Sequence, residues 1–111
     1  MKLVQEAITI AQIKEIGAQK PLEAVVDVDK NLMVIDIPDY MTGELYMLEE
    51  CGSRPENLWG IQLYPERYDR ADWVLFDAPM NSRPSGNQTN YIQDPSIREK
   101  IKIMLAQVVR P

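Results

Sequence analysis

The residues best suited to chemistry lie between Asp77 and Asp94, after a strand-like run and before a strongly patterned helix. This segment contains one cation, Arg83, and a Ser85-Gly86-Asn87 turn signal among several amides. Loops longer than about 12–15 residues without regular structure are uncommon in compact domains and are often functional. A guanidinium beside a glycine-containing turn can bind an anion, because the turn presents backbone N–H groups. The segment is therefore the first candidate for a site.

Arg83 supports two interpretations. It either contacts a small anionic ligand, or it forms an ion pair with Asp77 or Asp94 while the amides satisfy the backbone of the loop. The N-terminus of the following helix also favours anions, although Asp94 occupies its cap. Under the first interpretation, the predicted ligand-binding residues are Arg83, Ser85, Asn87, Asn90, Asp77, Trp59 and Glu66.

Three aspartates, Asp27, Asp29 and Asp36, lie on the two strands of a predicted hairpin. Strand alternation places Asp27 and Asp29 on one face, and carboxylate oxygens are the ligands that Mg²⁺ and Ca²⁺ prefer. The alternative, which we favour, is that all three face solvent beside a turn, since like charges on a surface repel weakly once they are screened. We therefore predict no metal site.

The chain has no histidine and a single cysteine, Cys51. Without histidine there is no imidazole base, no Ser-His or Cys-His nucleophile pair and no zinc site of the Cys/His kind. Cys51 precedes Gly52 at a predicted helix C-terminus, where the negative end of the dipole does not lower the pKa of a thiol. Glu44, Glu49 and Glu50 are typical of the polar side of that helix. The sequence indicates no catalytic residue and no cofactor.

The composition is that of an ordinary globular domain. The chain has 111 residues, of which 45% are hydrophobic and 26% are charged. Its net charge of -5 disfavours nucleic acid and anionic membranes, whose binding needs clustered Lys and Arg. No apolar run approaches the ~20 residues of a membrane span. With one cysteine and no signal-peptide core at the N-terminus, we expect a single domain, residues 1–111, in the cytoplasm.

Runs of β-branched and aromatic residues, bounded by turn signals, predict a mostly antiparallel sheet. Residues 22–37 are expected to form a hairpin that turns at Asp29-Lys30-Asn31, and Pro38 ends its second strand. The predicted strands are residues 2–8, 22–28, 32–37, 57–64 and 73–77. The largest aromatic side chains, Trp59, Tyr64, Trp73 and Phe76, either fill the core of this sheet or line a groove or a dimer face.

Helix signals occur at three places. Thr9 begins the first helix, with Gln12 completing a capping box, and residues 42–51 have helical spacing. Asp94 as N-cap and Pro95 at the first helical position begin the last helix. One face of this helix is apolar, at Ile97, Ile101, Met104, Leu105 and Val108. The elements together predict an α+β fold, a small mostly antiparallel sheet of about four to five strands with two or three helices packed on it.

Several segments, taken together, resemble a known family. They are VVDVDKNLMVID (25–36), SRPENLWGIQLYPE (53–66), DWVLFD (72–77), NSRPSGN (81–87) and DPSIREKI (94–101). From about Leu22 onward the chain is similar to the small bacterial family known only as domain-of-unknown-function family 5674. The combination of these segments is fairly specific, whereas no single segment is. The resemblance implies a single domain and brings no assigned activity with it.

The resemblance also implies a set of recurrent polar positions, which in this chain are Glu44, Trp59, Glu66, Asp77, Asn81, Arg83, Asn87 and Arg98. The chain departs from the family pattern in two places. Family members often have a His-x-Asp stretch before the glutamate, where this chain has Met41-Thr42-Gly43. They also tend to have basic residues after the loop asparagine, where this chain has Gln88-Thr89-Asn90. These departures weaken a metal or acid–base role and a phosphate or nucleic-acid role, respectively.

We expect a small bacterial, non-catalytic binding or interaction module that forms a homo-oligomer. A short chain with several large aromatic side chains can cover one face of its sheet with a second copy. The alternative is a protein or enzyme that binds a small anionic ligand through Arg83 and the Ser85–Asn90 loop, with Asp77 or Glu66 as its carboxylate. Regulation through nucleic acid is the least favoured function, because the chain is acidic.

Overall fold

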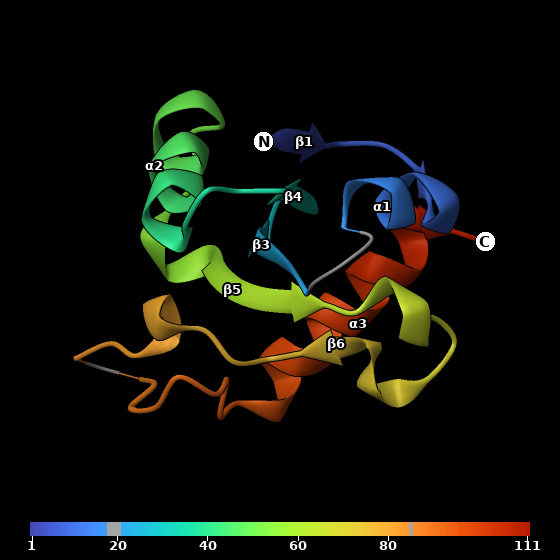
Figure 1. Cartoon of the computed structure of the whole chain (residues 1–111). Helices are drawn as coiled ribbons and strands as arrows, with labels where there is room; N and C mark the ends of the chain where they lie inside the picture. The colour runs from blue at the N-terminus through green and yellow to red at the C-terminus, as the bar shows by residue number, and fades with distance from the viewer. Residues whose placement is uncertain (18–20, 85) are drawn as a thin grey trace.

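A five-stranded sheet forms the middle layer of an α+β fold, with helices on both of its faces (Figure 1). The computed structural model describes residues 1–17, 21–84 and 86–111. The strand order is β1-β4-β3-β5-β6, and every neighbouring pair is antiparallel. The strands are β1 (Lys2–Val4), β3 (Leu22–Asp27), β4 (Leu32–Ile35), β5 (Leu58–Leu63) and β6 (Val74–Leu75). The fold class predicted from the sequence is confirmed.

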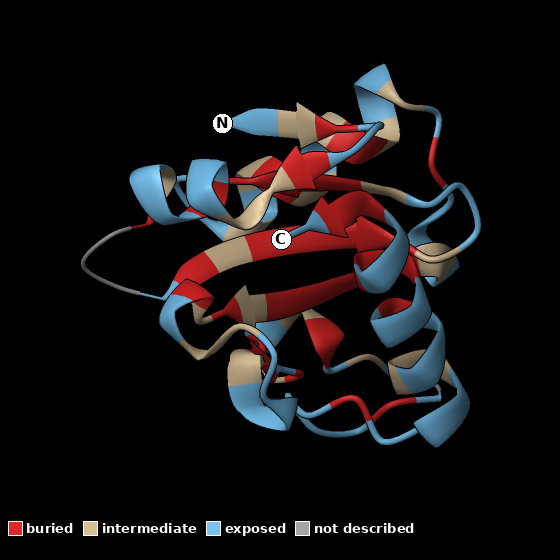
Figure 2. Ribbon diagram, turned by 90° about the vertical axis from the view of Figure 1, so that its right-hand side faces the viewer, coloured by how far each residue is buried: buried red, intermediate tan, exposed pale blue. Residues whose placement is uncertain are grey.

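One face of the sheet packs on α1 (Ile10–Ile16) and α3 (Pro95–Val108). The apolar face predicted for α3 lies against the strands, since Ile101, Met104 and Leu105 are buried in the same core as β3 and β5. Figure 2 shows buried residues along the central strands and exposed residues on the outer sides of the helices. In the described part of the chain, no helix combines the length and the apolar character needed to cross a membrane.

The opposite face of the sheet packs on α2 (Tyr40–Glu50). Met47 of α2 is buried among Val25, Val34 and Leu58, which belong to β3, β4 and β5. The helix begins two residues before the predicted range, because the Asp39 side chain accepts a hydrogen bond from the backbone N–H of Thr42 at 2.7 Å. It ends at Glu50, one residue before the end of the predicted range, and just past it Gly52 adopts a φ of +65°.

The hairpin between β3 and β4 corrects the expectation that its aspartates face solvent. Asp27 is fully buried, and its Oδ1 accepts hydrogen bonds from the N–H groups of Asp29 and Lys30, both at 2.9 Å. Its Oδ2 accepts from the Ser53 hydroxyl at 2.6 Å. The carboxylate therefore braces the turn and ties it to the segment after α2. Asp29 and Asp36 are exposed, as expected.

The ends of the chain are paired in a way that the sequence did not indicate. The predicted strand over residues 2–8 divides into β1 and β2 (Ile8–Thr9), and β2 pairs in parallel with β7 (Val109–Arg110). The predicted start of α1 is confirmed, because Thr9 and Gln12 exchange the two hydrogen bonds of a capping box. Four 3-10 turns complete the described elements: η1 (Pro55–Asn57), η2 (Pro65–Arg67), η3 (Ala71–Trp73) and η4 (Pro79–Asn81).

The two aspartate caps predict a loss of stability in acid. Hydrogen bonds from Thr42 lower the pKa of Asp39, and those from Ser96 lower the pKa of Asp94. A carboxyl whose pKa is lower in the folded state contributes fully above its ordinary value of 3.8 and loses that contribution as the pH falls through the folded pKa. The melting temperature, followed by circular dichroism, should therefore fall below about pH 4.

Replacing both caps by asparagine, which also caps helices but does not titrate, should flatten this fall relative to the parent chain. An unchanged pH profile in the Asp39→Asn/Asp94→Asn variant would show that other carboxyls cause the acid loss.

Candidate functional site

The amide-rich loop after β6 lies beside the part of the β5 edge that β6 does not pair with. β5 pairs with β3 along its whole length, whereas β6 lies opposite only Gln62 and Leu63. The outward N–H and C=O groups in the first half of β5 therefore need other partners, because unpaired buried backbone groups are costly. The 3-10 turn before the strand supplies one, since the Leu58 N–H donates to the Pro55 carbonyl.

Asn81 occupies the position that a neighbouring strand would take. Its Oδ1 accepts a hydrogen bond from the Gly60 N–H at 2.8 Å, and its Nδ2 donates to the Gly60 carbonyl at 2.9 Å. The same Nδ2 donates to the Asn90 carbonyl at 3.1 Å. The side chain is fully buried. One primary amide thus reproduces the two-way pairing of a β-ladder and joins β5 to both ends of the loop.

Gly60 permits this close approach because it has no side chain. A Cβ atom at this position would lie 2.7 Å from the Ala78 Cβ and 2.9 Å from the Met80 Cγ. Both distances are shorter than ordinary van der Waals contact, so any larger residue would push the loop away from the strand. This glycine within β5 therefore marks the docking point of the loop.

Arg83 completes the same edge. Its guanidinium lies 3.8 Å from the centroid of the Trp59 ring and donates from Nη2 to the Leu58 carbonyl. Among the described residues, no carboxylate lies within ion-pair distance of it, so the pairs considered with Asp77 and Asp94 are not formed. Burial lowers the pKa of Arg83, and Glu44 and Glu56 oppose that shift.

Asn87 is a second buried amide, and it holds the loop closed. Its Nδ2 lies within hydrogen-bond distance of the carbonyl oxygens of Asn81, Thr89 and Tyr91, at 2.8 to 3.0 Å. Its Oδ1 accepts from the Gln93 N–H at 2.8 Å. The polar atoms of this side chain are therefore used by the backbone of the loop itself.

The structure brings together only some of the predicted site residues. Trp59, Arg83 and Asn87 lie in one assembly, because the Arg83 N–H also donates to the Asn87 carbonyl at 2.8 Å. Asn90 contributes only its backbone carbonyl to this assembly, and the residue is exposed. Glu66 is exposed in η2, beyond the other end of β5 from Trp59.

Two further predicted residues need separate mention. Asp77 is half-buried and forms an isolated antiparallel β-bridge with Tyr91. Its backbone carbonyl accepts a hydrogen bond from the side-chain amide of Gln62 at 3.0 Å. Ser85 lies outside the described residues. Asn81, the side chain that joins the loop to β5, was indicated only by the resemblance to the family, because Gly60 is distant from it in sequence.

Tyr40 and Cys51 are two groups near the sheet whose pKa is raised. Burial raises the pKa of the Tyr40 hydroxyl, and Glu23, Asp77 and Tyr64 add to the shift. This hydroxyl donates to the Ile61 carbonyl at 3.0 Å. Burial likewise raises the pKa of the Cys51 thiol. Neither group is therefore an activated nucleophile at neutral pH.

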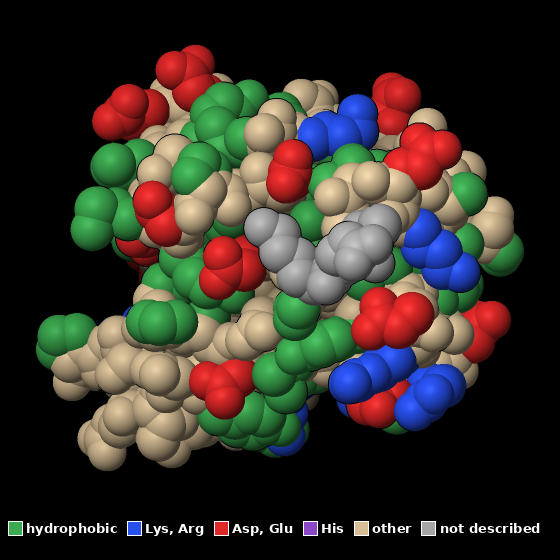
Figure 3. Space-filling model, viewed as in Figure 1, with side chains coloured by type: hydrophobic (Ala, Val, Ile, Leu, Met, Phe, Trp, Pro, Cys, Tyr) green, Lys and Arg blue, Asp and Glu red, His purple; other side chains and the backbone are tan. Residues whose placement is uncertain are grey.

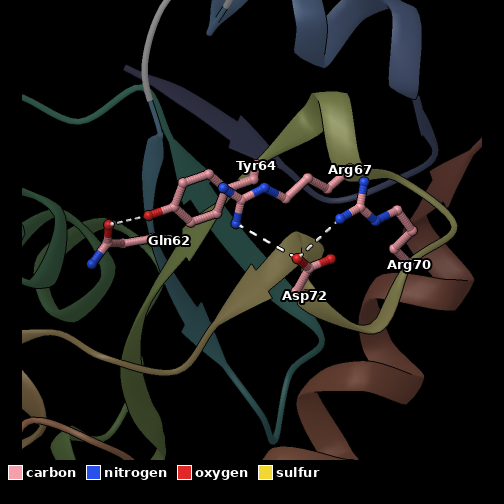
Figure 4. A network of polar contacts seen from close by, with 5 residues as sticks. All are labelled: Gln62, Tyr64, Arg67, Arg70 and Asp72. Atoms are coloured by element: carbon pink, nitrogen blue, oxygen red, sulfur yellow. Dashed lines mark hydrogen bonds and ion pairs between the residues drawn. The ribbon is translucent and has the colours of Figure 1, made fainter.

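A second polar network lies at the far end of β5 (Figure 4). Arg67 and Arg70 share the carboxylate of Asp72, at 3.8 and 3.4 Å. The Arg67 guanidinium also lies 4.3 Å from the centroid of the Tyr64 ring. Among the described residues, no group of three or more acidic or cysteine side chains is placed to hold a metal ion.

The sequence model of one family, described as a protein of unknown function (DUF5674), matches residues 2–108. The match spans nearly the whole chain, and the chain belongs to this family. No curated protein and no solved structure matches the chain. The membership confirms the resemblance drawn from the sequence segments, and the function has to be argued from the geometry.

The role of Asn81 can be tested by removing its amide. Asn81→Ala leaves the Gly60 N–H and C=O without partners in a buried place and should lower the free energy of unfolding by about 2–4 kcal/mol. Asn90→Ala is the matched control, since it removes an exposed amide from the same loop, and it should change stability by less than about 0.5 kcal/mol. Equal effects of the two changes in urea denaturation would contradict the assignment.

The Arg83 contacts predict that this side chain stabilises the fold. Arg83→Ala removes both the stacking on Trp59 and a charged hydrogen bond, and it should cost about 1–3 kcal/mol in denaturant unfolding. Arg83→Lys keeps the charge but not the planar group, so it should restore only part of that loss. A variant as stable as the parent would show instead that the guanidinium is free for a ligand.

Proposed function

We propose that the protein is a non-catalytic interaction module that pairs with a second copy of itself through α2. The observation that supports this proposal is a pair of exposed apolar side chains one turn apart on that helix. Met41 is 72% exposed and Leu45 is 47% exposed. Residues four apart on a helix lie on the same face, so the two form one stripe, which we call the α2 stripe.

The edges of the sheet favour pairing through side chains over pairing through strands. β1 and β6 are short, with three and two residues. Beyond β6 the edge is already used, because Ala78 N–H donates to Asn90 and Ile92 N–H donates to Phe76, both at 3.0 Å. Short or covered edges resist the addition of another strand. A partner therefore has more to gain from the exposed apolar side chains than from the backbone.

An interface of ordinary size would extend beyond the α2 stripe to neighbouring surface. A standard interface buries about 800 Å² on each partner, and the chain exposes 6291 Å² in all. Leu75 on β6 is 39% exposed and lies on the same side of the sheet as α2, because it pairs with Gln62. A twofold arrangement would place one α2 stripe on another, as self-complementary interfaces require.

The charge around the α2 stripe predicts how salt affects the pairing. Glu44, Glu49 and Glu50 belong to α2, which has no Lys or Arg. In the view of Figure 3, hydrophobic and acidic side chains lie over the side of the molecule that holds α2, while Lys and Arg gather toward the opposite side. Two copies of α2 would repel each other electrostatically, and screening would reduce this repulsion. Association should therefore strengthen as salt is added.

Binding of an anionic ligand through Arg83 and residues 85–90 is the weaker alternative. The guanidinium is half-buried on Trp59, and its charged neighbours Glu44 and Glu56 are acidic. An incoming anion would meet their negative potential. Regulation through nucleic acid has less support still, because the chain has a net charge of -5.

We also propose that the module is bacterial and works in the cytoplasm. The chain has one cysteine, so no disulfide can form within it. The raised pKa of Cys51 keeps that thiol protonated and slow to oxidise. The lack of an internal disulfide suits a reducing compartment, where structural disulfides are rare.

The test is the oligomeric state of matched charge variants in sedimentation velocity. The parent chain should dimerise at micromolar concentration, and Leu45→Glu should weaken the dimer by about tenfold or more. Ile103→Glu adds the same charge at a position that is 51% exposed on α3, and it should leave the dimer unchanged.

A parent chain that stays monomeric at every concentration and salt level would overturn the proposal. Equal weakening by Leu45→Glu and Ile103→Glu would overturn the choice of α2, because it would reflect total charge alone.

A further inference from the structure

A cavity of about 340 Å³ lies between the segment after η2 and the C-terminal half of α3. Small-molecule sites typically occupy about 300–1,000 Å³, so this cavity falls at the lower end of that range. Neither Arg83 nor any residue of the α2 stripe lines it. The cavity is therefore separate from the loop site and from the proposed pairing surface.

The floor of the cavity is apolar and partly aromatic. Tyr68 and Trp73 pack edge to face, with ring centroids 5.2 Å apart and an angle of 82° between the rings. Val74 and Leu105 are both buried and close the bottom. Ala106 is exposed at the rim, where its small side chain leaves the entrance open. Such a surface suits a flat apolar group more than a hydrated one.

The rim of the cavity carries an excess of positive charge. Lys102 lies on the same face of α3 as Leu105 and Ala106, three and four residues earlier, and it lines the cavity with Arg70. Arg70 shares the Asp72 carboxylate with Arg67, so one acid serves two cations (Figure 4).

Among the described residues, no carboxylate lies within ion-pair distance of Lys102. Of the described residues that line the cavity, Asp69 is the one acid. Arg67, Arg70 and Lys102 therefore outweigh Asp69 and Asp72 by one charge, in a chain whose net charge is -5. A local excess of this sign favours an anion at the rim.

We infer that this cavity binds a small organic monoanion with a flat apolar body, of the aromatic carboxylate class. The ring lies on Trp73 and Leu105, and the carboxylate meets Lys102 and Arg70 at the rim. The apolar floor supplies contact area, and the charged rim fixes the orientation of the ligand, as in most small-molecule sites. The ligand needs no metal ion and no covalent step.

Benzoate is the probe for this site, and the indole N–H signals of the ¹⁵N-labelled full chain are the readout. The Trp73 signal should shift in a saturable way, whereas the Trp59 signal, from a residue that does not line the cavity, should stay in place. Benzamide has the same shape without the charge and should bind about fivefold more weakly. No saturable shift at Trp73, or equal binding of the two compounds, would overturn the inference.

Variants of exposed residues separate the two parts of the site. Lys102→Gln should weaken benzoate binding about fivefold, and Ala106→Phe should abolish it by filling the entrance. Lys100→Gln removes the same charge from an α3 residue that does not line the cavity, and it should leave binding unchanged. Equal effects of Lys102→Gln and Lys100→Gln would overturn the anchoring role of Lys102, and undiminished binding in Ala106→Phe would overturn the cavity itself.

Discussion

The outer edge of β5 needs hydrogen-bond partners that the neighbouring strand is too short to supply. β6 pairs with Gln62 and Leu63 and stops. Without the loop, the outward N–H and C=O groups towards the start of β5 would bond to water or stay unpaired. Each such group that is buried and unpaired costs about 1–3 kcal/mol. The side chains of Asn81 and Arg83 take these positions on Gly60 and Leu58. The side chains of the loop therefore make the hydrogen bonds that a further strand would make to this edge.

This constraint explains the unusual composition of the loop. Its buried amides, Asn81 and Asn87, pair with backbone groups, and its one cation stacks on Trp59. Residues that resemble a ligand site in sequence are thus used to hold the fold. The two surfaces that we propose for recognition are the α2 stripe, whose apolar side chains are exposed, and the cavity beside α3, which apolar side chains line in part. The cavity lies away from the segment that first suggested a site, whereas α2 contacts that segment through η4.

The features that the sequence predicted are those whose contacts are local. The Asp94 cap, the capping box at Thr9, the turn at residues 29–31 and the αL residue Gly52 each depend on partners a few positions away. The apolar face of α3 follows from helical periodicity in the same way. These signals were sufficient to establish the α+β class and most element positions.

The features that the sequence did not predict depend on distant partners. Asn81 meets Gly60 across 21 residues, Arg83 meets Leu58 across 25, and Asp27 meets Ser53 across 26. A single sequence does not specify which strand edge is left open or which amide reaches it. The same limit applies to the pairing of β2 with β7, which joins the two ends of the chain, and to the burial of Asp27, which depends on a hydroxyl from another segment.

The most direct measurement of the central claim is native-state hydrogen exchange at the Gly60 amide. If the Asn81 side chain substitutes for a strand, this N–H should exchange only through global unfolding, as slowly as the amides of β5 that pair with β3. Exchange at the rate of an exposed loop amide would contradict the account, because it would mean that the edge of β5 is open to water and that the loop does not complete the sheet.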